Sequence, residues 1–338
     1  MREKPLTLCK YFAEAMKHSI IFSTLLLVCI LAGCRQGRYV TFSGYAQGGT
    51  YTVKADLTGV TTSARTIQHT IDALLDSIDF SVSGYNKNSL LSRYNAGEDI
   101  LPNRFFYEVR ALSERYRTET NGAFDAASAP LFDIWGFGFT TDSLPDPARI
   151  QAALAACKDE KVLNFNAIAQ GYTCDIVAGY LHSLGVHNML VDIGEIFCEG
   201  FNAAGKGWTI GVDNPVDGND TPGQDLRGIW QSDGRPYGIV TSGNYRKFYI
   251  RDGKKYAHTI DPRNGYPVEH NLLSATIVAP TAAEADALAT ACMVIGPEQA
   301  RTLIESRPDL EGYLITAEGV WMSDGFAERA RGTEFPQK

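Results

Sequence analysis

The sequence predicts an α+β fold in which mixed β-sheets pack against helices in a single unit. Segments with strand character and segments with helical apolar spacing follow one another without a regular βαβ alternation, which disfavours a doubly wound sheet. Hydrophobic residues make up 44% and charged residues 21% of the 338-residue chain, as in packed globular proteins. No linker or internal repeat divides the chain. Disordered, fibrous and multi-span membrane classes are therefore excluded.

The first 33 residues have the pattern of a signal peptide. Lys17 and His18 precede an apolar run over residues 19–33, which is shorter than the roughly 20 residues of a spanning helix. The run closes on Leu-Ala-Gly-Cys34, a bacterial lipobox pattern, so we expect cleavage at residue 33 and lipidation of Cys34. Met16 offers a second start codon, and a buried N-terminal helix is the alternative.

The signal peptide predicts a location in the bacterial cell envelope, with the folded domain over residues 34–338 lipid-anchored and facing the periplasm or the exterior. Removing four basic and two acidic residues with residues 1–33 changes the net charge from −8 to −10, which disfavours nucleic acid as a partner. The four remaining cysteines lack metal-binding spacing, so we expect small buried residues or one or two disulfides: Cys157, Cys174, Cys198 and Cys292.

In the first half of the domain, strands precede helices. Residues 39–56 have β character with a break at Gly48-Gly49-Thr50, and residues 66–78 have helical apolar spacing. The polar segment 81–95, with its Gly and Asn residues, is expected to carry a loop. Residues 104–119 place apolar side chains on one helical face and stop at Asn121-Gly122. The aromatic, Gly-punctuated segment 122–138 is expected to be a loop that plugs the core or holds a flat ligand.

In the second half, a helix over 168–184 ends at Gly185 and a buried strand follows over 188–193. Three further strands are expected over residues 208–212, 237–241 and 247–250. Asp252-Gly253 predicts a hairpin, because both residues tolerate positive φ. A strand over 272–279 is followed by a capping box at 281–284, a helix over 282–295 and a new helix at Pro297.

The helix over 282–295 carries the first candidate site. Asp286 and Thr290 stand at i and i+4 on one face, so their oxygens can share a hard cation such as Mg²⁺. A solvated Asp beside a helix-bonded Thr is the alternative. Residues 200–206 match the start of the phosphate-binding motif GxxxxGK, but they are not expected to bind phosphate. Gly207 replaces the Ser or Thr that holds Mg²⁺, and a strand follows in place of a helix.

A second group of reactive side chains lies at the end of the predicted hairpin. His258 and Asp261 lie at its far end before a Pro-Gly turn, and an imidazole can take a proton from an attacking hydroxyl at neutral pH. The polar turn 242–246 ends on Arg246, which is suited to phosphate. A structural His and an exposed, ion-paired Arg are the alternatives.

Eight ordered motifs resemble the ApbE-type FAD:protein FMN transferases over nearly the whole mature chain. They are GGTYTV from Gly48, SGYNKNSLLSRYN from Ser83, GAFDAASAPLFDIWGFG from Gly122, LNFNAIAQGY from Leu163, LVDIG from Leu190, TSGNYRKFY from Thr241, HTIDPRNGYPVEHNLLSATIVAPTAAEADALATA from His258 and VIGPE from Val294. The resemblance implies a T-fold-like core and a Mg²⁺-dependent enzyme. Such an enzyme cleaves FAD, joins FMN to a Thr or Ser of an acceptor protein through a phosphoester and releases AMP.

The resemblance also implies roles for single residues. Mg²⁺ would be held by Asp286, Thr290 and the main chain of Ala167 and Ala289. His258 would act in transfer, oriented by Asp261. The implied flavin contacts are Gly48, Tyr85, Ala123, Phe124, Asp125, Asn164, Gln170 and Ile260, with Trp135 as a further aromatic surface. Thr241, Ser242 and Arg246 would line the pocket.

The chain departs from the family pattern at three places. Gly48-Gly49-Thr50 replaces the common Met-Gly-Thr, Gln170 replaces a Lys, and Asp192-Ile-Gly194-Glu195 is one Gly short. The last difference is expected to shift a turn near the flavin. None of the three removes a metal ligand or His258.

Three alternatives share parts of this evidence. A Mg²⁺-dependent FAD pyrophosphatase would use water as the nucleophile, and a lipid-anchored flavin-binding protein would have no activity. A nutrient-binding lipoprotein would leave the eight motifs unexplained. For the transferase, the expected partner is an exported or membrane redox protein with an accessible Thr or Ser, which the chain itself does not identify.

Overall fold

The computed structural model describes residues 37–138, 144–216, 218–219, 221, 223–245, 248–251 and 253–331. The predicted signal peptide, the lipobox and Cys34 lie outside these residues, as does Arg246. Within the described part of the chain, no helix has both the length and the apolar character that crossing a membrane requires. The mixed α+β fold class predicted from the sequence is confirmed.

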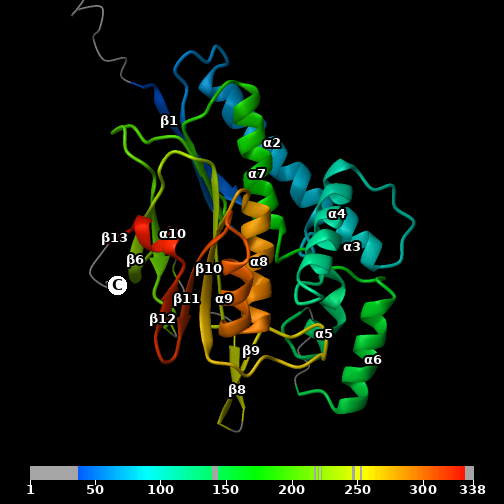
Figure 1. The fold of residues 1–338 in the computed structure, drawn as a ribbon. Coiled ribbons are helices and arrows are strands. Elements are labelled where there is room, and N and C mark those ends of the chain that lie inside the picture. Colours follow the sequence, from blue (N-terminus) through cyan, green and yellow to red (C-terminus); the bar gives the residue numbers. More distant parts are fainter. Residues whose placement is uncertain are drawn as a thin grey trace, which may run out of the picture. The chain divides into compact units, whose positions relative to one another are not determined.

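An antiparallel sheet of eight strands forms the centre of the fold, in the order β1-β2-β3-β4-β7-β10-β11-β12 (Figure 1). Adjacent strands pair through regular registers, with one irregularity between Leu272 and Ser274. The strands are β1 (Tyr39–Ala46), β2 (Gly49–Asp56), β3 (Met189–Asp192), β4 (Ile196–Glu199), β7 (Tyr237–Gly243), β10 (Leu272–Ala279), β11 (Glu311–Thr316) and β12 (Val320–Met322).

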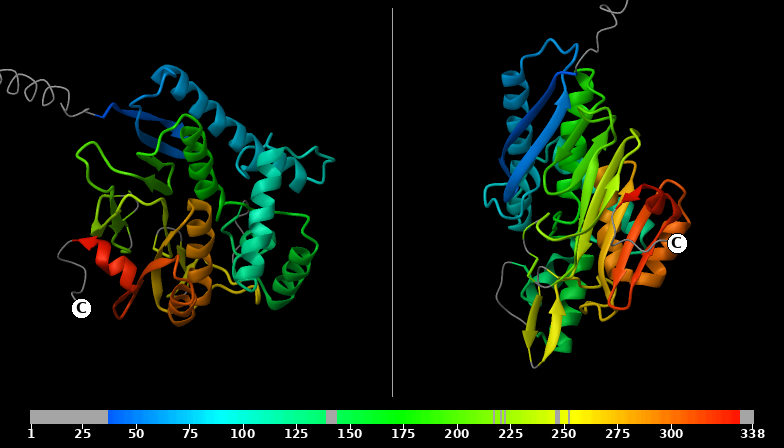
Figure 2. Two further views of the ribbon diagram at one scale, coloured as in Figure 1. Left: turned by 45° about the horizontal axis from the view of Figure 1, so that its top comes forward. Right: turned by 90° about the vertical axis from the view of Figure 1, so that its left-hand side faces the viewer.

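The two faces of this sheet are covered differently because side chains alternate along each strand. Helices α7 (Ala169–Ser183) and α8 (Ala282–Ile295) cover one face, where Val191 and Val240 are buried (Figures 1 and 2). On the other face Ile239 and Tyr313 pack with Trp230 of a three-stranded sheet. That sheet comprises β5 (Thr209–Asp213), β6 (Leu226–Gln231) and β13 (Ala330–Arg331).

The remaining helices flank the core, and a two-stranded hairpin extends beyond the end of the central sheet (Figure 2). The helices are α2 (Ala64–Val82), α3 (Leu90–Asn95), α4 (Arg104–Glu119), η1 (Ala126–Ser128), α5 (Ala129–Ile134), α6 (Pro147–Lys158), α9 (Pro297–Glu305) and α10 (Asp324–Arg329). The hairpin pairs β8 (Phe248–Arg251) with β9 (Lys254–Ala257), as Asp252-Gly253 predicts, although Asp252 itself lies outside the described residues.

The predictions for two segments are incomplete. The loop predicted within 81–95 lies between α2, which continues to Val82, and α3, which begins at Leu90 and is capped by Ser89 accepting a hydrogen bond from Ser92 N–H. The segment 122–138, predicted to be a loop, contains η1, capped by Asp125, and α5, which has Pro130 in its first turn. Helix α6, capped by Asp146, was not predicted at all.

Helices α7 and α8 approach closely where α7 begins. A Cβ on Gly171 would lie 2.3 Å from the Ala282 carbonyl oxygen, so only glycine fits this contact. The carboxylate of Asp175, one turn further along α7, accepts hydrogen bonds of 2.8 and 2.9 Å from the N–H groups of Ala282 and Ala283. These bonds satisfy donors that a helix start leaves unpaired. Thr281 caps Glu284 N–H as predicted.

Gly171→Ala is therefore expected to destabilise the protein by about 2 kcal/mol, because the added methyl group forces two helix backbones apart. Gly179→Ala on the same helix is the matched control, since nothing lies within 4 Å of its Cβ position. The control is expected to be neutral or more stable by up to about 1 kcal/mol. Urea denaturation of both variants measures the difference, and equal stabilities would contradict the close contact.

Candidate active site

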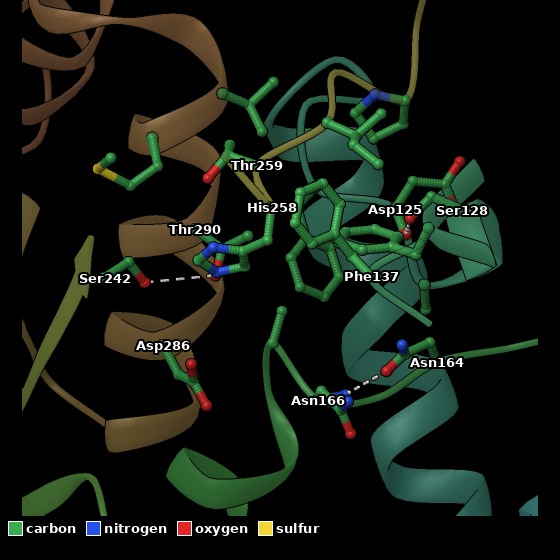
Figure 3. A pocket seen from close by; sticks show the side chains of 18 of the residues that line it. Asp125, Ser128, Phe137, Asn164, Asn166, Ser242, His258, Thr259, Asp286 and Thr290 are labelled. Carbon is green, nitrogen blue, oxygen red and sulfur yellow. Dashed lines mark hydrogen bonds between the residues drawn. The ribbon is translucent and has the colours of Figure 1, made fainter. Parts of the chain in front are cut away.

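A cavity of about 310 Å³ lies between α8 and the segment 123–137 (Figure 3). Its walls come from sequence segments far apart: β7, the turn after β9, the start of α7 and the β3–β4 turn. It contains most of the residues predicted for metal, flavin and catalysis: Tyr85, Ala123, Phe124, Asp125, Asn164, Ala167, Thr241, His258, Ile260, Asp286 and Thr290. The fold thus brings the separate motifs to one place.

One wall of the cavity is formed by the predicted cation ligands. Asp286 and Thr290 project from successive turns of α8 into the cavity, and the Thr290 hydroxyl lies 3.5 Å from the Ser242 hydroxyl of β7 (Figure 3). Ala167 lines the same cavity just before α7. Carboxylate, hydroxyl and carbonyl oxygens are the donor types that Mg²⁺ prefers.

The Asp286 carboxyl group is buried. Only 4% of the residue is exposed, and its Oδ2 accepts one hydrogen bond of 3.1 Å from Gly171 N–H. Burial, with a smaller contribution from Asp175, raises the pKa of Asp286 well above the ordinary carboxyl value. Among the described residues Asp286 has no Lys, Arg or His partner. A buried carboxylate is expensive unless it is paired, so the residues present fit a bound divalent cation.

The cavity as a whole is acidic. Asp125, Glu195 and Asp286 line it, and no Lys or Arg is among its described lining residues. Arg117 lies outside the lining, with its Nε 3.4 Å from Asp125 Oδ2. An anionic ligand such as a pyrophosphate would be repelled by these walls unless a cation accompanied it. The acidic walls of the cavity and the oxygen donors around Asp286 therefore both favour a bound divalent cation.

His258 lies beside Thr290 and faces the cavity (Figure 3). Its ring meets Phe137 edge-on at 6.3 Å, and Phe137 stacks on Tyr249 of β8 at 5.2 Å between ring centres. Tyr249 in turn stacks on Tyr256 of β9. This series of rings fixes one end of the hairpin against the cavity, so the His258 imidazole is held next to the cation ligands.

The opposite wall is apolar and amide-rich. Phe124, Phe132 and Ile260 supply apolar surface, as a flat aromatic ligand requires. Asn164 Oδ1 accepts a 2.8 Å hydrogen bond from Asn166 N–H, and Asn166 Nδ2 donates to the Tyr85 hydroxyl at 3.3 Å (Figure 3). This network ties Tyr85, which is 67% exposed, to the rim of the cavity.

Five predicted residues do not line the cavity, and Arg246 lies outside the described residues; the five are Gly48, Trp135, Gln170, Asp261 and Ala289. Gly48 occupies the β1–β2 turn with φ +84°, and its neighbour Gln47 donates to Thr173 of α7. Ala289 is wholly buried within α8. Gln170 lies against Gly194, whose left-handed backbone (φ +89°) closes a tight β3–β4 turn. Glu195, which follows Gly194 in this turn, lines the cavity.

Asp261 requires a correction. Its carboxylate accepts hydrogen bonds from the Arg263 backbone and guanidinium at 2.8 to 2.9 Å and from Asn264 at 3.3 Å. It therefore stabilises the turn after β9, while its neighbours Ile260 and Pro262 line the cavity. Trp135 also lies outside the cavity, because it is buried and donates to the Gly265 carbonyl at 2.8 Å.

Several cavity residues were not predicted as site residues. Asn166, Ser128, Phe132 and Phe137 stand inside quoted motifs, so their position next to predicted residues was the available signal. Thr259 and Tyr245 also stand inside quoted motifs, whereas Met293 lies between two of them and is brought in by the packing of α8. The four cysteines predicted as small buried residues are buried and free, so the disulfide alternative is wrong.

Protonation of Asp175 is expected to make stability depend on pH. Burial, reinforced by Glu284, raises the pKa of Asp175 to about 7, above the roughly 3.9 of an unfolded chain. The folded state therefore holds an extra proton between these values, and this contribution to stability is lost as the pH rises towards 7. Without divalent cations, the stability of the wild type relative to Asp175→Asn should fall by about 2 kcal/mol between pH 5.5 and 8. Urea denaturation measures the stability of both proteins at each pH. The same dependence of stability on pH in both would contradict this prediction.

The chain is similar in sequence to one family of known proteins. The model of the ApbE family matches residues 47–314. The chain is 32% identical over 289 residues to the FAD:protein FMN transferase of Escherichia coli K12, covering 77% of this chain and 80% of the relative. It is 32% identical over 332 residues to that of Vibrio cholerae, covering 91% and 95%.

Solved structures agree with the sequence relatives. The flavin transferase ApbE from Vibrio cholerae aligns with a TM-score of 0.72 at 29% identity, covering 87% of this chain and 99% of that one. The apo form of the Pseudomonas stutzeri flavinyl transferase ApbE aligns with a TM-score of 0.75 at 31% identity, covering 88% and 98%. The family match over residues 47–314 includes all the described residues that line the cavity.

Proposed function

The chain belongs to the ApbE family, and we propose that it transfers FMN from FAD to a Thr or Ser hydroxyl of an acceptor protein. The transfer forms a phosphoester and releases AMP. The observation that carries the proposal is the buried carboxylate of Asp286, which lines the same acidic cavity as Thr290 and His258. The relatives named FAD:protein FMN transferase support the reaction class.

We propose that Mg²⁺ is held by Asp286, Thr290 and the Ala167 carbonyl. When bound, it supplies positive charge that neutralises the pyrophosphate as AMP leaves. The contribution of α8 is to present two oxygens from one rigid face, with Gly171 N–H orienting the carboxylate. This rigidity matters because phosphoryl transfer requires mainly positioning and electrostatic stabilisation from the protein.

His258 is the proposed proton acceptor. The acceptor hydroxyl attacks the phosphorus nearest riboflavin, its proton passes to the imidazole, and the bond from that phosphorus to the AMP oxygen breaks. Edge-on contact with Phe137 restrains the ring beside the cavity. The apolar wall of Phe124 and Ile260 holds the isoalloxazine, and the Asn164–Asn166 network supplies polar contacts at its rim.

We further propose a lipid anchor at Cys34 and an exported or membrane redox protein as the acceptor. The support is the signal-peptide pattern of residues 1–33, which independently fits an enzyme that acts outside the cytoplasm. Growth in labelled palmitate tests the anchor, since label should enter the wild type and not Cys34→Ser. Equal labelling of both proteins would overturn it.

The experiment that tests the function incubates the full chain with FAD, Mg²⁺ and a Thr-containing acceptor domain, then measures intact masses and free AMP. An acceptor heavier by one FMN residue with matching AMP supports the transferase. AMP and free FMN without a mass shift would favour the pyrophosphatase, in which water replaces the acceptor hydroxyl. Tight FAD binding without AMP release would favour a flavin-binding protein.

A further inference from the structure

A second group of metal-binding side chains lies at the opposite end of α7 from the cavity. His182 stands in the last turn of α7, His187 in the loop before β3, and Glu199 at the end of β4. One ligand atom from each lies within 4.8 Å of the other two. By the helical rise, the 15 residues of α7 place this cluster about 22 Å from the start of the helix, where Ala167 and Gly171 serve the cavity.

The side chains already converge on the carboxylate. His182 Nε2 lies 2.5 Å from Glu199 Oε2, and His187 Nδ1 lies 3.4 Å from Glu199 Oε1. The two imidazole rings are 5.4 Å apart at an interplanar angle of 33°. Ligands of a tetrahedral Zn²⁺ ion, at about 2.0–2.2 Å from the metal, are about 3.4 Å from one another. Small side-chain rotations therefore suffice to bring the three donors into a coordination shell.

The backbone around the three donors is fixed independently of any hydrogen bond among them. The turn that ends α7 is closed by Gly185 N–H donating to the His182 carbonyl at 2.8 Å. A Cβ on Gly200, directly after Glu199, would lie 2.3 Å from the His187 carbonyl, so these two segments are in close contact. Trp208 Nε1 donates to the Glu199 carbonyl at 2.9 Å. The site is thus preorganised, which lowers the cost of binding.

We infer that His182, His187 and Glu199 form a second metal site, which takes a borderline transition-metal cation such as Zn²⁺ rather than Mg²⁺. Two imidazoles and one carboxylate suit Zn²⁺, whereas Mg²⁺ prefers oxygen ligands alone. The side chain of His187 is 69% exposed and that of Glu199 is 18% exposed, so water can complete the shell on the solvent side. The ion would connect the end of α7 to the end of β4.

Equilibrium dialysis of the full chain against Zn²⁺, with excess Mg²⁺ present and metal analysis of the protein, tests this site. One Zn²⁺ per chain is expected for the wild type and for His258→Ala. His182→Ala/His187→Ala should lose it, and Glu199→Gln, which keeps the shape of the side chain, should bind at least about 10-fold more weakly. The exposed His69→Ala on α2 is the matched control and should bind like the wild type.

Three further measurements distinguish a metal site from a structural role of these residues. Co²⁺ bound to the wild type should show the visible absorption of a low-symmetry site, and the double variant should not. Circular dichroism without metal shows whether the variants are folded. FMN transfer should be unchanged in the double variant, because none of the three residues lines the cavity. Unchanged Zn²⁺ binding in the double variant, or loss of binding in His258→Ala alone, would overturn the proposal.

Discussion

Replacing Asp286 with Ala is expected to lower the rate of AMP release from FAD by about 10³-fold or more at saturating FAD. The carboxylate is the one charged group that the proposed Mg²⁺ site contains, and metal stabilisation of a transferring phosphoryl group contributes several kcal/mol. The measurement is the initial rate of AMP release as a function of Mg²⁺ concentration. Thr290→Val removes a neutral ligand and should cause a smaller loss, seen mainly as a higher Mg²⁺ requirement.

Asp286→Asn separates a metal ligand from a structural residue. Burial raises the pKa of Asp286, so the charged form is costly in the metal-free protein. The neutral amide removes this cost and can still accept from Gly171 N–H. We expect the Asn variant to be at least as stable as the wild type without Mg²⁺, yet nearly inactive. A stable Asn variant with wild-type activity would show that the ligand assignment is wrong.

Replacing His258 with Ala is expected to lower the rate of transfer by about 10³-fold, within the range for loss of a general base. FAD binding should change little, because the apolar wall and the Asp286–Thr290 pair are intact. Flavin fluorescence measures binding, and intact mass of the acceptor measures transfer. Partial rescue by added imidazole would identify proton transfer rather than packing against Phe137 as the lost contribution.

Two further substitutions test whether His258 acts only by packing against Phe137. His258→Phe keeps an aromatic ring at the edge of Phe137 and should be as inactive as the Ala variant if proton transfer is the role. Phe137→Leu removes the ring contact and keeps the imidazole, so we expect a loss well below that of His258→Ala. Restored activity in His258→Phe would contradict the assignment of His258 as the proton acceptor.

The local signals in the sequence predicted much of the fold. Period-2 and helical patterns located β10 and α8 with correct bounds, because both are buried elements with strong caps or turns at their ends. The loop within 81–95 was predicted, but the short helix α3 after it was not, and η1 and α5 within 122–138 were missed because such short helices leave little apolar periodicity in the sequence. Helix α6 was missed although Asp146-Pro147 is a start signal, because its buried residues are only Ile150, Ala153 and Cys157 and give a weak apolar pattern.

The site was predictable where chemistry and spacing coincide. Asp286 and Thr290 follow from i,i+4 spacing, and motif resemblance placed His258 and Asn164 correctly in the same cavity. The family resemblance implied that Asp261 orients His258. In the structure, the Asp261 carboxylate instead forms an ion pair with Arg263. The close contact of Gly171 with Ala282, and the convergence of His182 and His187 on Glu199, depend on packing between distant segments. The positions of these residues along the sequence indicate neither the helix contact nor the cluster.

The most direct test of the central claim is a crystal structure of the full chain with FAD and Mn²⁺ in place of Mg²⁺, with the metal located by anomalous scattering. We expect an anomalous peak between the Asp286 carboxylate and the Thr290 hydroxyl, and an isoalloxazine ring against Phe124 and Ile260. Metal found away from Asp286, or FAD bound outside this cavity, would contradict it.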